Sequence, residues 1–209
     1  MVRFATIGLT VLLALCVVPA ATHAAAAPVD PAAFHDDMRK LWEDHVTWTR
    51  LYIVNALADL PSKGLTATRL LQNQTDIGVA VGTFYGPAAG DKLAGLLKEH
   101  ILTAATLIEA ARVGDTAKKE EASKQWYANA DAIAVFLSEA NPKNWPLADM
   151  KSMMRHHLDL TAAEVTAGLT KNWAADIAAY DEVHVQILKM ADMLSAGIVK
   201  QFPAKFKKT

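Results

Sequence analysis

The chain has 209 residues, of which 52% are hydrophobic and 21% are charged. This composition excludes a disordered chain, and a net charge of −1 removes the main reason to expect nucleic acid as a partner. Cys16 is the only cysteine, so the chain can form neither an internal disulfide nor a metal site built on several cysteines.

Residues 1–24 have the pattern of a secretory signal peptide. A basic start precedes a long apolar run, and Thr22 and Ala24 supply small side chains before the expected cleavage site. An uncleaved membrane anchor is the alternative, although the run is near the lower limit for a spanning helix. Cleavage after Ala24 removes Arg3 and no acid, so the net charge of −1 becomes −2. We therefore expect export to the periplasm, cell wall or medium, without stable membrane insertion.

Residues 25–209 predict a single all-α domain. Asp30 places a capping oxygen before Pro31, and apolar residues then recur at steps of three and four until Pro61 and Gly64. Similar stripes and turn signals predict five more helices, over about 66–84, 87–112, 115–140, 146–168 and 172–201. Short loops favour antiparallel neighbours, so the fold class expected is an antiparallel bundle of about six helices.

Two short internal similarities suggest a duplication. Residues 45–49 resemble residues 157–161, and Asp76-Ile77 resembles Asp176-Ile177. The bundle would then consist of two related three-helix halves, with coincidence as the alternative.

Polar side chains on the apolar stripes of the predicted helices indicate a functional site. Four different predicted helices each hold a histidine near their middle, namely His45, His100, His157 and His184. Mid-helix positions of an antiparallel bundle lie at one level, so we expect these imidazoles to converge. Asp181 and His184 have the spacing of the Glu-x-x-His motif of di-metal bundles, with aspartate in place of glutamate. Asp76 lies near the apolar stripe of the helix predicted over about 66–84. Burying such groups costs a few kcal/mol each unless they are paired or coordinated.

These residues predict a site for a divalent transition metal (zinc, copper, iron, manganese or nickel), with the ligand set His45, His100, His157, His184, Asp181 and Asp76. The expected role is metal binding or handling in the cell envelope, with weaker binding near pH 5 than near pH 7.5. The first alternative is a metalloenzyme that uses the same site for oxygen, peroxide or hydrolytic chemistry. The second is a structural or interaction bundle, in which the histidines only bond groups such as Thr49, Thr161 or Tyr180.

Several segments resemble a group of exported bacterial all-helical proteins. They span nearly all of residues 25–209 and comprise 41–50, 73–78, 126–131, Asn141-Pro142 with Trp145, 157–161, 173–177 with Tyr180, Asp181 and His184, and 201–203. The resemblance implies export and a helical fold. Some members carry the labels glycosyltransferase or acetylglutamate kinase. Those activities ordinarily rest on α/β folds, and this chain lacks their alternation of strands and helices.

Overall fold

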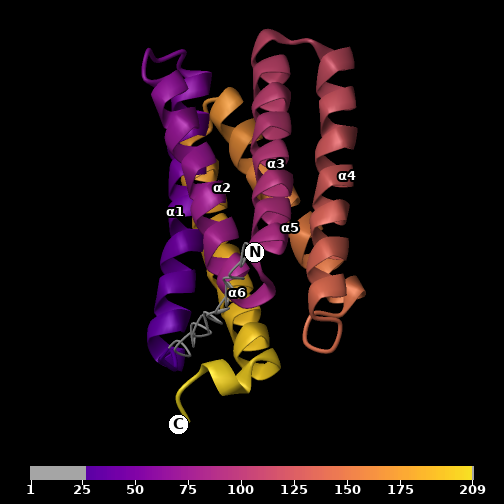
Figure 1. Ribbon diagram of the computed structural model, residues 1–209. Helices are drawn as coiled ribbons and strands as arrows, with labels where there is room; N and C mark the ends of the chain where they lie inside the picture. The colour runs from indigo at the N-terminus through magenta and orange to yellow at the C-terminus, as the bar shows by residue number, and fades with distance from the viewer. Residues whose placement is uncertain (1–26, 209) are drawn as a thin grey trace, which may run out of the picture.

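The computed structural model describes residues 27–208, which form six long helices (Figure 1). The elements are α1 Pro31–Leu57, α2 Lys63–Tyr85, α3 Pro87–Val113, α4 Thr116–Ala140, α5 Leu147–Leu169, α6 Trp173–Gln201 and the short 3-10 helix η1 Pro203–Lys205. The predicted all-α bundle of about six helices is confirmed. None of the helices in this range has the length and apolar character needed to cross a membrane. The predicted signal peptide, residues 1–24, lies outside the described residues.

Side-chain caps and a left-handed glycine set the helix ends. The Asp30 carboxylate accepts a hydrogen bond from the amide of Ala32 at 2.9 Å at the start of α1. Asp115 caps α4 in the same way. Between them, Gly114 ends α3 with a φ of 75°, a conformation that glycine adopts without steric cost. α2 begins three residues before the predicted start at Thr66, because the Thr66 amide already donates a helical bond to the preceding turn.

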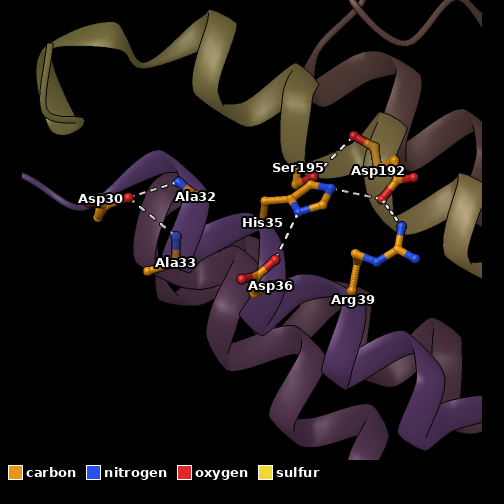
Figure 2. A network of polar contacts seen from close by, with 8 residues as sticks. All are labelled: Asp30, Ala32, Ala33, His35, Asp36, Arg39, Asp192 and Ser195. Carbon is orange, nitrogen blue, oxygen red and sulfur yellow. Dashed lines mark hydrogen bonds and ion pairs between the residues drawn. The ribbon is translucent and has the colours of Figure 1, made fainter. Parts of the chain in front are cut away.

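The six helices form a closed ring. Each helix packs against the next one along the chain, and α6 packs against α1. Successive helices are antiparallel, so α1, α3 and α5 run in the same direction (Figure 1), and α1 also contacts α3 and α5. Figure 2 shows polar contacts of the α1–α6 seam. There Arg39 Nη1 donates to Asp192 Oδ1 at 2.6 Å, and His35 Nε2 lies 2.9 Å from the same oxygen.

Two glycines bring α2 and α3 close together. A Cβ atom at Gly90 would lie 2.5 Å from the carbonyl oxygen of Gly78, and a Cβ at Gly78 would lie 2.6 Å from that of Gly90. Real side chains do not tolerate such distances, so the two backbones touch here only because both residues are glycine.

The interior contains two apolar cores of unequal size. The larger core draws on all six helices, and its fully buried members include Met38, Ile77, Leu93, Ile133, Met150 and Ile187. The smaller core consists of Ile53, Ala56, Ile108 and Val165, nearer to the C-terminal ends of α1, α3 and α5. Three of the four histidines predicted to form a site, His45, His100 and His157, lie on these three helices where the larger core gives way to the smaller one.

Candidate functional site

Three of the four stripe histidines come together inside the ring. His45 of α1, His100 of α3 and His157 of α5 are all buried, with 3%, 3% and 5% of their surface exposed. The three side chains line one cavity, and the rings of His45 and His157 have centroids 5.9 Å apart. Because α1, α3 and α5 run in the same direction and α1 contacts both of the others, their mid-helix residues meet at one level.

The other three predicted site residues lie elsewhere. His184 Nε2 is 2.9 Å from Glu43 Oε1, and 34% of the His184 side chain is exposed. The expectation that His184 joins the cluster is wrong, because the buried face of α6 is centred on residues such as Ile187 and His184 lies at its edge. Asp181 is exposed, and Asp76 accepts a hydrogen bond from the glutamine side chain one turn before it. The predicted convergence of these two carboxylates on the histidines is therefore wrong as well.

Each core histidine is held by an amide side chain of the following helix. In all three cases an amide oxygen lies about one hydrogen-bond length from Nδ1, in the pairs His45–Gln74 at 3.2 Å, His100–Asn129 at 3.0 Å and His157–Gln186 at 3.0 Å. The partners are 29 residues apart in every pair. The repeating unit of these contacts is thus a two-helix hairpin, whereas the short sequence similarities suggested three-helix halves.

The amide groups also decide which ring nitrogen carries the proton. Asn129 Nδ2 donates to the carbonyl of Leu96 at 3.1 Å, and Gln186 Nε2 donates to that of Met153 at 3.2 Å. Gln74 Nε2 donates to a carbonyl one turn earlier in its own helix. In each case the amide oxygen faces the imidazole as an acceptor, so the proton lies on Nδ1 and the lone pair on Nε2.

The three Nε2 atoms have different surroundings. Trp126 Nε1 donates to His100 Nε2 at 3.1 Å, so that lone pair is occupied. No donor among residues 27–208 reaches Nε2 of His45 or His157, and both rings line the cavity. Two unshared lone pairs therefore face the cavity.

The core histidines are neutral near pH 7. Burial lowers the pKa of His45 and of His100 to about 3, and the neighbouring rings lower both further. Burial lowers the pKa of His157 to about 4. A proton on any one ring would place a charge in an apolar interior. This end of the cavity therefore offers hydrogen-bond acceptors without charge.

Two threonines add further acceptors one turn beyond the histidines. Thr49 Oγ1 donates to the backbone carbonyl of His45 at 2.7 Å, and Thr161 Oγ1 donates to that of His157 at 2.9 Å. In the structural alternative these hydroxyl groups are expected to bond the imidazole rings, but their protons are directed to backbone oxygens. Both threonines line the cavity, where their oxygens present lone pairs.

The cavity extends from the histidines toward the C-terminal ends of α1, α3 and α5, with a volume of about 640 Å³. Its walls are mainly apolar and include Leu70, Ile101, Ala104, Leu107, Ile108 and Val165. At the outer end, the start of α4 contributes two acids and two bases, Asp115, Lys119, Glu120 and Lys124. Clefts of this size, with apolar walls and a few convergent polar groups, are typical of small-molecule sites.

A buried ion cluster that no sequence pattern predicts joins α1, α5 and α6. Arg50 donates to Glu164 Oε1 at 2.9 Å and makes two bonds of 2.5 Å to the Asp176 carboxylate. Burial raises the pKa of Glu164 to about 7, although Arg50 acts in the opposite direction. Arg50 lies beside the apolar stripe of α1, and no local signal links it to a carboxylate 126 residues away.

No group of three or more histidine, cysteine, aspartate or glutamate side chains in the described range is placed to hold a metal ion. Comparison with known proteins supplies no ligand either, because no protein-family model, curated protein or solved structure matches the chain. The chemistry of the cavity itself is therefore the basis for assigning a function.

Proposed function

We propose that the protein is an exported binding protein that takes up a small molecule in the cavity between its helices. The observation that carries this proposal is a cavity of about 640 Å³ with apolar walls, ending in three neutral histidines. The signal pattern of residues 1–24 supports export.

The histidine end of the cavity favours small-molecule binding over a purely structural role. The amide bonds to Nδ1 tie the two helices of each hairpin together and would suit a structural or interaction bundle. That role leaves the Nε2 lone pairs of His45 and His157 unexplained. Both Nε2 atoms are open to the cavity rather than sealed in the interior, so a bound molecule that donates to them forms a hydrogen bond that a purely structural role does not use.

Blocking the cavity tests the proposal. Ala104 lies one turn after His100 and lines the cavity, so Ala104→Phe should fill the space beside the histidines. We expect the native chain to bind an uncharged fluorescent probe such as 1-aminoanthracene, and Ala104→Phe to weaken the binding at least about tenfold. Ala163→Phe makes the same change on an exposed position of α5 and serves as the control. Equal affinity in both variants, or no binding to the native chain, would contradict the proposal.

A divalent transition metal is a second candidate ligand at the histidine end. Histidines that bind metals through Nε2 usually donate their Nδ1 proton to an oxygen acceptor, as all three core histidines do here. Two imidazoles on one zinc ion, with Zn–N bonds of about 2.0–2.1 Å, have ring centroids about 5–6 Å apart. The 5.9 Å between His45 and His157 is close to this range. The other coordination positions of the metal would be filled by His100, once its hydrogen bond from Trp126 is broken, or by a ligand atom that enters through the cavity. The metalloenzyme alternative also requires such an open position.

The metal candidate predicts a single zinc site by calorimetry near pH 7. His45→Asn and His157→Asn should each abolish the site, whereas His184→Asn should keep it, because His184 lies outside the cluster. The sequence alone predicts weaker metal binding near pH 5 than near pH 7.5, but pKa values of about 3 to 4 leave all three rings unprotonated at pH 5. The loss of zinc binding is therefore expected only near pH 4 and below. A native chain that binds no zinc excludes the metal and leaves the small-molecule proposal intact.

A further inference from the structure

We infer that the cavity selects a neutral amphipathic molecule, with an apolar body and a hydroxyl head group that donates a hydrogen bond to Nε2 of His45 or His157. Alkylphenols and long-chain alcohols share this chemistry. The inference rests on the proposed small-molecule function and adds to it the class of the ligand.

The inner end of the cavity favours a ligand whose head group donates a hydrogen bond. Nε2 of His45 and of His157 presents a lone pair, because each Nδ1 donates its proton to a glutamine oxygen. The Thr49 and Thr161 oxygens also present lone pairs, because their protons are directed to backbone carbonyls. A head group that only accepts hydrogen bonds, such as an ether or a ketone, would leave all four unsatisfied.

The same end disfavours a charged head group. A carboxylate would face lone pairs on every side and would be buried without a cation. An ammonium group would donate, but it would be buried without a counterion, because the carboxylates that line the cavity, Asp115 and Glu120, lie at its outer end. A hydroxyl group supplies the proton without the charge.

The rest of the cavity suits an apolar body. The walls between the histidines and the rim are formed mainly by leucine, isoleucine, valine and alanine side chains. At the outer end, Asp115 and Glu120 balance Lys119 and Lys124, so the rim carries no net charge that would select an ionic tail.

Three matched probes test the head group, namely 4-hexylphenol, its methyl ether 4-hexylanisole, and hexylbenzene. They share the apolar body, and only the phenol donates a hydrogen bond. The phenol is neutral near pH 7, because phenolic groups ordinarily ionise near about pH 10. With EDTA present, so that no metal supplies the contact, we expect the phenol to bind about tenfold more tightly than the anisole.

Asparagine variants isolate the Nε2 atoms. In His45→Asn and His157→Asn, the asparagine amide nitrogen takes the place of Nδ1, so the bond to Gln74 or Gln186 can persist while Nε2 is removed. We expect the phenol preference to fall to about threefold or less in at least one variant, and to disappear in the double variant. The affinity for the anisole should change little. His184→Asn should keep the full preference, because His184 lies on the outer seam.

The outcomes separate this inference from the proposed function. Equal affinities of the native chain for the phenol and the anisole would overturn the inference and leave the cavity as an apolar site. Tighter binding of 4-hexylbenzoate than of the phenol would also overturn it. If the native chain binds 1-aminoanthracene but none of the three probes, the inference is overturned; if it binds none of the four, the proposed function itself is wrong.

Discussion

Between about pH 6.5 and pH 4.5, the free energy of unfolding should fall steeply as the pH decreases. His45, His100 and His157 have pKa values of about 3, 3 and 4 in the folded chain, against 6.5 when exposed. The unfolded chain therefore binds three protons in this range that the folded chain excludes. Each such proton lowers the free energy of unfolding by about 1.4 kcal/mol per pH unit, so the three together give about 4 kcal/mol per unit.

Glu164 has the opposite effect on the free energy of unfolding over the same pH range. Its pKa is about 7 in the folded chain and 4.5 when exposed, so the folded chain holds one proton more than the unfolded chain between these values. The contribution of Glu164 to stability therefore falls as the pH rises. Subtracting this proton leaves a net uptake of about two protons, or about 3 kcal/mol per pH unit on unfolding.

Urea denaturation at several pH values measures this slope directly. His45→Asn should reduce the slope by about 1.4 kcal/mol per unit, and Glu164→Gln should increase it by a similar amount, because one histidine or the opposing carboxyl is lost. A free energy of unfolding that stays constant between pH 6.5 and pH 4.5 would show that the core histidines are not neutral and buried.

Replacing Arg50 by leucine should cost about 3–5 kcal/mol of stability near pH 7.5. Arg50 is the cation that holds the buried carboxylates of Glu164 and Asp176, and its removal leaves them uncompensated in the interior. Arg50→Lys should also destabilise, because an ammonium group cannot reproduce the two parallel bonds to Asp176. Differential scanning calorimetry and urea denaturation measure both changes.

An exposed ion pair provides the control for Arg50. Arg155 bonds Asp131 on the surface, so Arg155→Leu should cost less than about 1 kcal/mol. Adding Glu164→Gln and Asp176→Asn to Arg50→Leu removes the stranded charges and should restore part of the lost stability. A loss no larger for Arg50→Leu than for Arg155→Leu would mean that the cluster is solvated rather than buried.

The helices could be predicted from the sequence because their signals are local. Asp30, Asp115 and Asn172 each cap the start of a helix within four residues along the chain. Apolar stripes at helical spacing likewise depend only on residues within a few turns. The bounds predicted for residues 87–112 and 172–201 therefore differ by only one residue at one end from those of α3 and α6.

The candidate site could be predicted only in part, because periodicity does not separate the centre of a buried face from its edge. Val183 and His184 are neighbours in the sequence, yet Val183 is fully buried and His184 bonds Glu43 at the surface. His45, His100 and His157 happen to lie near the centres of their faces.

The partners of the core histidines depend on how the helices pair. Gln74 and Gln186 are unremarkable as single residues, and their spacing of 29 residues from His45 and His157 is a signal that becomes visible only when three hairpins are compared. The sequence similarities that we considered compared halves of the chain and therefore missed this repeat.

Both proposed ligands depend on three neutral core histidines that carry their proton on Nδ1, with the Nε2 lone pairs of His45 and His157 turned toward the cavity. Imidazole ¹⁵N NMR near pH 6, with histidine variants for assignment, measures the charge of each ring and which ring nitrogen carries the proton. We predict three neutral rings with unprotonated Nε2, and Nε2 shifts for His45 or His157, larger than for His100, when 4-hexylphenol is added. A charged ring, or a proton on Nε2 of His45 or His157, would contradict the account.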